Sequence, residues 1–224
     1  MIIGIDLSLN HAGLVQLDAG GRVVWWDWVT DVRAASDRGG RGVYLPRPKS
    51  EDKEQGSLER LVWWEKYISE LFVERDPFYV GIEGYAFRAE GNAAYQIGEL
   101  GGLVRLAALH VGAKLRCPDP MSVKMFGASR GNATGAEVAD AVRAMTGGLF
   151  VAANPPQKAG KKQNALPEED LSAAWVVAQM VWTELQLRAG SMRLDQLGEK
   201  QLQVFNRCTK SQPINLLART WLCA

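Results

Sequence analysis

The order of the apolar segments is the feature that most constrains the fold of this chain. Three β-branched or aromatic runs come first and predict successive antiparallel strands at 2–7, 14–17 and 23–29. From about residue 57 onward, helical patterns alternate with short apolar runs, and a strand–helix–strand connection pairs its two strands in parallel. We therefore expect an α/β domain with a mixed five-stranded sheet, antiparallel strands first and parallel strands after, flanked by helices.

The later elements follow from apolar residues that recur near a 3.6-residue period. A first helix is predicted from Ser57, as an N-terminal cap, to Asp76 and Pro77, which end it. A buried strand then ends at Glu83, and another apolar strand follows at 113–118. The remaining helices are predicted at about 92–111, 120–127, 136–147 and 168–187.

Length and local composition predict one main domain. Its 224 residues can bury a single sizeable core, and we expect that domain at 1–189. Two segments inside it lack apolar periodicity: a loop insertion at 31–57 and a basic loop at 154–166. Residues 190–224 are expected to form a helical or extended tail.

Composition excludes several classes of protein. With 47% hydrophobic and 23% charged residues, the chain is not a disordered segment, and a net charge of +1 argues against nucleic-acid binding by bulk charge. Three widely spaced cysteines offer neither a zinc site nor a disulfide framework, which favours a cytoplasmic protein. No apolar run approaches the roughly 18 residues of a membrane span, so no membrane association is expected.

Three acidic residues stand out against this background. Asp6 lies inside an apolar strand, where an ionised side chain is unfavourable unless it is compensated. Glu83 ends a second apolar strand, and Asp170 opens an apolar helix. Two of them have simpler interpretations, since Asp170 can interact favourably with the helix dipole and Glu83 can end its strand in solvent, whereas Asp6 is the hardest to explain structurally. Together they predict a carboxylate cluster that holds a divalent cation, with Mg²⁺ the best fit, for phosphodiester hydrolysis.

Several ordered motifs around these acids resemble the RuvC-type Holliday-junction resolvases of the RNase-H-like (retroviral integrase) superfamily. GIDLS with Asp6 is similar to the first-strand motif, and DPFYVGIEGYAF with Glu83 to the segment of the second acid. GELGGLVRLAAL, PDPMSVKMFGASRGNATGAEV and EEDLSAAWVVA then resemble the helix after that acid, the lysine-bearing segment and the acid-bearing final helix. The resemblance spans most of the chain.

The resemblance implies a homodimeric crossover junction endodeoxyribonuclease that cuts a four-way DNA junction by paired nicks with Mg²⁺, for which Mn²⁺ substitutes. It implies that Asp6, Glu83, Asp170 and Glu169 are catalytic metal ligands and that Lys124 contacts a phosphate near the scissile bond. The residues implied to bind DNA are Lys124, Arg130, Asn132, Tyr85 and Phe87, the aromatic pair by stacking on a base near the crossover or else by packing under a loop.

Two departures from the family pattern affect the site. The final helix lacks the second acid that the family places three residues from the first, so the fourth ligand is absent or comes from Glu169 or Glu168. Gly135 stands where a lysine is common, and Arg130 is expected to replace it as a phosphate contact. The longer 31–57 loop and the tail suggest a phage or otherwise divergent member. His11 is interpreted as a surface turn residue without a role in proton transfer.

Three alternative functions remain open from the sequence. A junction-binding protein that has lost cleavage would follow from the missing fourth acid. A nuclease of the same fold could act on other branched DNA or on structured RNA. An actin-like or sugar-kinase-like ATPase is a third alternative, because GIDLSLNHAG resembles a first phosphate-binding loop, but the chain shows no internal repeat or second phosphate loop.

Overall fold

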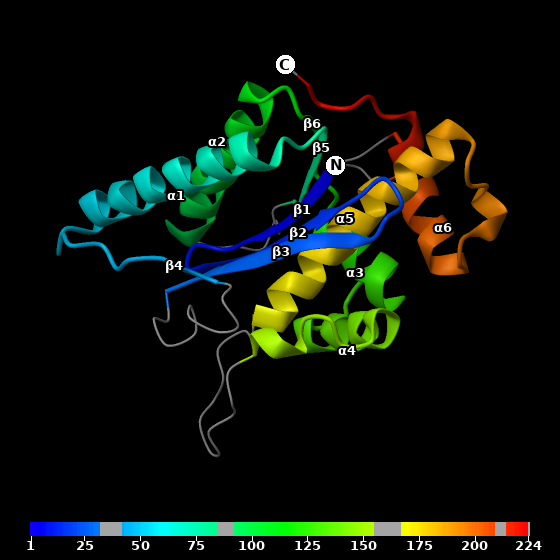
Figure 1. Cartoon of the computed structure of the whole chain (residues 1–224), viewed down its shortest axis with the longest axis horizontal. Helices are drawn as coiled ribbons and strands as arrows, with labels where there is room; N and C mark the ends of the chain where they lie inside the picture. Colours follow the sequence, from blue (N-terminus) through cyan, green and yellow to red (C-terminus); the bar gives the residue numbers. More distant parts are fainter. Residues whose placement is uncertain (32–41, 85–91, 155–166, 209–213, 224) are drawn as a thin grey trace, which may run out of the picture.

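The structure, a computed structural model, describes residues 1–31, 42–84, 92–154, 167–208 and 214–223 (Figure 1). Its centre is a six-stranded sheet in the order β4-β3-β2-β1-β5-β6. Strands β1 with β2 and β2 with β3 pair antiparallel, whereas β1 with β5, β5 with β6, and β3 with β4 pair in parallel. The strands are β1 (Ile2–Leu7), β2 (His11–Leu17), β3 (Val23–Thr30), β4 (Val43–Tyr44), β5 (Tyr79–Ile82) and β6 (Lys114–Arg116).

The predicted mixed sheet is confirmed, but its strand number was wrong by one. The segment 31–57 contains β4, whose Val43 and Tyr44 pair with the end of β3 at the edge of the sheet. Two residues are too few for an alternating pattern, so sequence periodicity could not indicate this strand.

Six α-helices complete the described part of the fold: α1 (Lys53–Arg75), α2 (Asn92–His110), α3 (Pro120–Ala128), α4 (Gly135–Thr146), α5 (Pro167–Ala189) and α6 (Glu199–Asn206). The start predicted for the first helix was late, because Asp52 rather than Ser57 caps it and accepts a hydrogen bond from the backbone N–H of Gln55 at 2.8 Å. At the other end, Asp76 adopts the left-handed conformation that terminates the helix. No helix among the described residues is long and apolar enough to cross a membrane.

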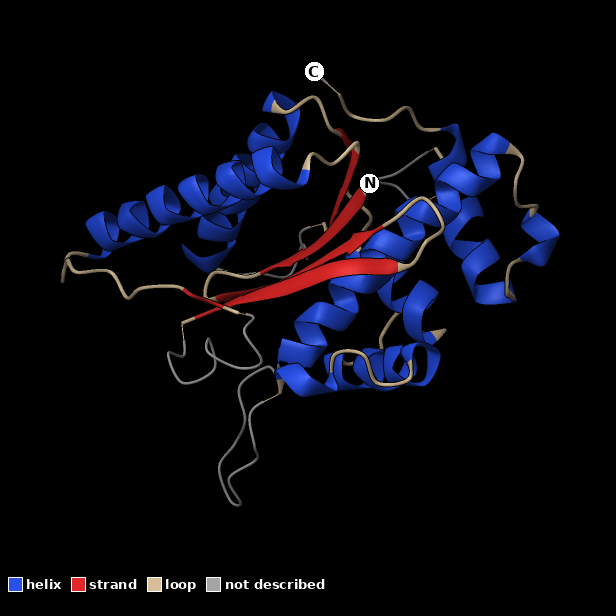
Figure 2. Ribbon diagram, viewed as in Figure 1, coloured by secondary structure: helices blue, strands red, loops and turns tan. Residues whose placement is uncertain are grey.

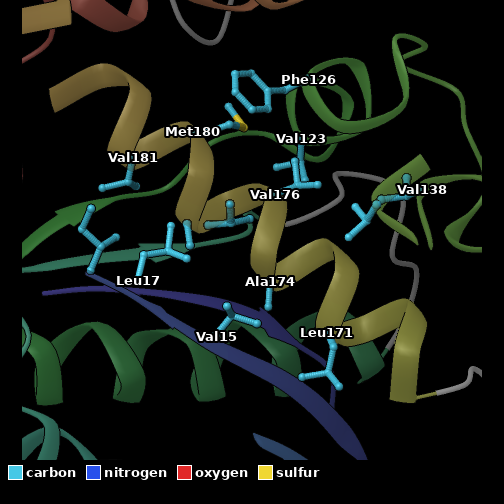
Figure 3. Close-up of a cluster of buried hydrophobic side chains, with 14 of the residues drawn as sticks. Val15, Leu17, Val123, Phe126, Val138, Leu171, Ala174, Val176, Met180 and Val181 are labelled. Carbon is cyan, nitrogen blue, oxygen red and sulfur yellow. The ribbon is translucent and has the colours of Figure 1, made fainter. Parts of the chain in front are cut away.

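The helices cover the two faces of the sheet in separate layers (Figure 2). Helices α1 and α2 pack on the face that carries Ile3 and Ile5, where Trp64 and Phe72 are fully buried. Helix α5 crosses the opposite face and packs against β1, β2 and β5, with α3 and α4 outside it. Figure 3 shows this second core, in which Val15 and Leu17 of the sheet meet Ala174 and Val181 of α5.

Glycines let α5 lie directly on the sheet. A Cβ atom at Gly4 would lie 2.1 Å from the carbonyl oxygen of Ala174, and one at Gly13 would lie 2.3 Å from that of Asp170. Gly81 is paired with Gly4 in the neighbouring strand, and a Cβ there would lie 2.7 Å from the side chain of Val177. Backbone contact of this kind requires glycine. The strand ends and the first turn of α5 are thereby held close together.

The C-terminal residues pack against the domain. Phe205 of α6 is fully buried and meets Phe126 of α3 edge to face, with their ring centroids 6.1 Å apart. Leu222 pairs with Leu115 of β6. Below this bridge, Arg116 donates two hydrogen bonds to the fully buried Glu184 of α5, at 2.9 and 2.5 Å. The segment thus braces α3 and α5 on the side away from α1.

Candidate metal-binding active site

Strand register places Asp6 and Glu83 side by side. Gly4 pairs with Gly81 and Ile5 with Ile82 in the parallel ladder, so the next residues on the α5 face are Asp6 and Glu83. The backbone N–H of Glu83 continues the ladder by donating to the carbonyl oxygen of Ile5 at 3.0 Å. Ile3 and Ile5 belong to the opposite core, which leaves Asp6 on the face toward α5.

Asp170 enters the same site from the first turn of α5. Its backbone lies against Gly13, the residue that pairs with Asp6 across the β1–β2 hairpin. Asp170 is 7% exposed, and its negative charge raises the pKa values of both Asp6 and Glu83. The structure therefore brings together the three acids that the sequence singled out.

The electrostatics of the site oppose three ionised carboxylates. Burial, followed by the charges of Glu83 and Asp170, raises the pKa of Asp6 well above its ordinary value of 3.8. Burial also raises the pKa of Glu83, although its hydrogen bond with Asp6 acts in the opposite direction. A hydrogen bond between two carboxyl groups needs one proton, which Asp6 and Glu83 would share.

Lys124 is the cation of this cluster. It lies in α3, half-buried, and its charge lowers the pKa values of Asp6 and Glu83. Asp119, which caps α3 by accepting from the backbone N–H of Ser122 at 3.0 Å, adds a further negative charge near Glu83. The sequence prediction did not include Asp119, because a cap residue before a helix has an ordinary structural explanation.

Glu168 and Glu169, the two candidates for a fourth carboxylate, have different surroundings. Glu168 is 2% exposed and accepts two hydrogen bonds from Arg143, both at 2.9 Å, and another from Asn154. Glu169 lies beside Gly135 at the start of α4, where an added Cβ would be 2.5 Å from its Oε2 atom. A larger residue at Gly135 would require the end of the Glu169 side chain to move. Glu168 is thus held in an ion pair, whereas Glu169 lies near α4 and also near enough to Asp170 that burial and the charge of Asp170 raise its pKa.

The DNA-binding residues predicted from the resemblance occupy different environments. Arg130 and Asn132 are exposed in the turn between α3 and α4, and Arg130 forms an ion pair with Glu137. Glu137 also completes a capping box with Thr134 at the start of α4. Tyr85 and Phe87 lie outside the described residues.

The interpretation of His11 as a surface turn residue was wrong. His11 is the first residue of β2, and its Nδ1 atom lies 2.8 Å from Oδ2 of Asp170. Burial lowers the pKa of His11, but the hydrogen bond and the charge of Asp170 outweigh that effect, and the pKa is raised. The alternation of β2 was an available signal, because it puts His11 on the same face as Gly13 and Val15.

The donor set of the site fits a hard divalent cation, although the side chains are not already arranged around one. Within the described ranges, no three His, Cys, Asp or Glu side chains form a ready metal-binding group. Asp6 and Glu83 instead lie buried beside Asp170, and burial together with the negative charge of Asp170 raises the pKa values of both. A divalent cation relieves both costs by replacing the proton, and carboxylate oxygens are the ligands that Mg²⁺ and Mn²⁺ prefer.

Comparison with known proteins identifies the fold. No family model and no curated protein matches the sequence. A RuvC structure from Thermus thermophilus is 22% identical, with 84% of this chain and 96% of that chain covered and a TM-score of 0.53. T. thermophilus RuvC in complex with a Holliday junction substrate is 20% identical, covers 85% of this chain and 96% of that chain, and also gives a TM-score of 0.53. The chain therefore has the RuvC fold, a mixed sheet flanked by helices as in RNase H.

Proposed function

We propose that this protein is a metal-dependent endonuclease that resolves four-way DNA junctions by paired symmetric nicks. The observation that carries the proposal is the meeting of Asp6, Glu83 and Asp170 at one end of the sheet, beside Lys124. Such a group combines oxygen ligands for Mg²⁺ with a cation for a phosphate. Mn²⁺ is expected to substitute for Mg²⁺.

Each side chain has a defined part in this chemistry. Asp6, Glu83 and Asp170 would hold the cation, and Asp6 would release the proton that it shares with Glu83. Bound there, the cation supplies an activated water and stabilises the charge on the phosphodiester oxygens. Lys124 would bind the phosphate whose negative charge increases during attack. Glu169 would become a fourth ligand of the cation if its side chain turned away from α4.

The choice of a DNA junction as substrate is supported by the solved complex of T. thermophilus RuvC with a Holliday junction, which this chain matches over most of its length. Arg130 and Asn132 are exposed in the turn that follows the Lys124 helix, and we assign them to backbone phosphates. Tyr85 and Phe87 are proposed to stack on bases near the crossover, where a stacked base contributes about 1–3 kcal/mol. Binding should weaken as salt increases.

Paired nicks need two active sites, and we propose a homodimer. Helix α2 presents two large apolar side chains to solvent, Tyr95 at 75% exposure and Leu106 at 54%. Eleven residues are about three helical turns, so both lie on one face, with Gly102 between them. A Leu106→Asp variant should sediment as a monomer and should nick the two strands of a junction independently.

The test is cleavage of an end-labelled four-way junction in Mg²⁺, with a linear duplex of the same sequence as the substrate control. Wild type should release nicked duplexes from the junction alone. Asp6→Asn should bind the junction without cutting it. Asp195→Asn is a matched control, because Asp195 is an exposed acid that pairs with Arg193 away from the site.

The outcomes separate the alternatives. A junction that is bound but left intact by wild type in both Mg²⁺ and Mn²⁺ would make the protein a non-cleaving junction binder. Cutting of structured RNA in preference to the junction would keep the chemistry and change the substrate. Equal activity of wild type and Asp6→Asn would remove the carboxylate site from the mechanism.

A further inference from the structure

His11 joins the sheet to the helix that carries Asp170. Residues of β2 alternate between the two faces of the sheet, and His11, Gly13 and Val15 share the face toward α5. The Nδ1 atom of His11 lies 2.8 Å from Oδ2 of Asp170, across 159 residues of sequence. The side chain of His11 is 37% exposed and that of Asp170 is 10% exposed, so the contact is partly buried.

The backbone of His11 is fixed independently of this contact. Ser8 donates to the carbonyl oxygen of His11 through both its backbone N–H and its Oγ atom, at 2.9 Å each. The Oγ atom of Ser8 in turn accepts a hydrogen bond from the backbone N–H of His11 at 3.2 Å. The turn between β1 and β2 thus closes around Ser8, and the imidazole projects from an anchored position.

Asp170 is the acid of the cluster that most needs such support. Asp6 and Glu83 sit on adjacent hydrogen-bonded strands, whereas Asp170 reaches the site from a helix. Pro167 occupies the position three residues earlier on α5 and offers no polar side chain. The ring of His11 engages Oδ2 of Asp170, and the charge of the same carboxylate acts on Asp6 and Glu83.

We infer that His11 is a positioning residue, which orients the Asp170 carboxylate for cation binding through the Nδ1–Oδ2 hydrogen bond. The inference rests on the proposed function, because it gives Asp170 the role of a metal ligand. Hydrogen-bond partners of ligating side chains fix the orientation of the ligand, and their loss commonly reduces metal affinity 10- to 100-fold.

Calorimetric titration of the intact protein with Mn²⁺ tests this role without any nucleic acid. His11→Ala should bind Mn²⁺ about 10- to 100-fold more weakly than wild type. His11→Asn should stay within about threefold of wild type, because its amide nitrogen occupies the place of Nδ1 relative to the backbone. His110→Ala is the matched control, since His110 is the other histidine and lies exposed at the end of α2. Unchanged affinity in a folded His11→Ala protein would overturn the inference.

Electron spin-echo spectroscopy of the Mn²⁺-loaded protein distinguishes positioning from direct ligation. A positioning role predicts no directly coordinated ¹⁴N in wild type. A ¹⁴N coupling that is present in wild type and lost in His11→Ala would overturn the inference, because His11 would then be a ligand itself.

Junction cleavage then separates this inference from the proposed function. In His11→Ala, the Mn²⁺ concentration for half-maximal cutting should rise by the same factor as the dissociation constant, and the rate at saturating Mn²⁺ should return close to that of wild type. A low rate at saturating Mn²⁺ with unchanged affinity would overturn the positioning role but leave the nuclease intact. If wild type binds Mn²⁺ but cuts no junction, the proposed function fails, and the titration still decides the role of His11.

Discussion

Replacing Asp6 by Asn should make the cation-free protein more stable while it abolishes cutting. Neighbouring strands lie about 4.8 Å apart, so ionised Asp6 and Glu83 would repel each other by about 3 kcal/mol at an effective dielectric constant of about 20. Lys124 and the shared proton offset part of this repulsion. We expect a net gain of about 1–2 kcal/mol, or an increase in Tm of about 2–8 °C for a chain of this size.

The pH dependence of this gain has a definite sign. Burial and neighbouring charges raise the pKa values of Asp6 and Glu83 above their ordinary values of 3.8 and 4.5. The folded protein therefore holds more protons than the unfolded chain above those values, and its stability falls as pH rises through the raised pKa values. The advantage of Asp6→Asn over wild type should accordingly be larger at pH 8 than at pH 5.

The assay is thermal unfolding in EDTA and in Mg²⁺, followed by circular dichroism. A ligand at 100 times its dissociation constant adds about 2.7 kcal/mol, so saturating Mg²⁺ should raise the Tm of wild type above that of Asp6→Asn. Asp195→Asn should behave as wild type in both buffers. A lower Tm for Asp6→Asn than for wild type in EDTA would refute the argument from repulsion.

Three further perturbations probe the surroundings of the site. Gly13→Ala should lower the free energy of unfolding by about 1–3 kcal/mol and weaken Mn²⁺ binding, because its Cβ would lie 2.3 Å from the backbone of α5. The control Val15→Ala should destabilise the fold without weakening Mn²⁺ binding. Arg116→Met should lower the free energy of unfolding, measured by chemical denaturation, by about 3 kcal/mol, because the buried Glu184 loses one of its partners. The double variant Arg116→Met/Glu184→Leu should recover most of that stability. Lys124→Ala should slow junction cutting about 100-fold without weakening Mn²⁺ binding, since it removes a positive charge; weaker Mn²⁺ binding would contradict its assignment to the phosphate.

The sequence was sufficient for the features that depend on local pattern. Strand periodicity and the order of elements predicted the mixed sheet, and the acids at strand ends predicted where the cluster would lie. Asp6 and Glu83 meet because parallel register pairs the residues that precede them, Gly4 with Gly81. Neither result depends on the details of side-chain packing.

The contacts that were not predicted all join distant segments. The pairing of His11 with Asp170 depends on how closely α5 approaches β2, and no local pattern encodes that distance. Glu168 remained open as a ligand because its partner Arg143 lies on a different helix. The two-residue strand β4 and the helix cap at Asp52 were not predicted for another reason. Both are shorter than the stretch of sequence over which apolar periodicity can be recognised.

The glycines beneath α5 also affect how freely the sequence of this protein can change. At Gly4 and Gly13, the separation between helix and sheet is set by backbone atoms rather than by the size of core side chains. Aliphatic residues farther along α5 can therefore be exchanged for others of similar volume without moving the acids relative to one another. A fold built in this way can retain the geometry of its site while most of its residues diverge, and a low sequence identity to another chain of the same fold is then the expected outcome.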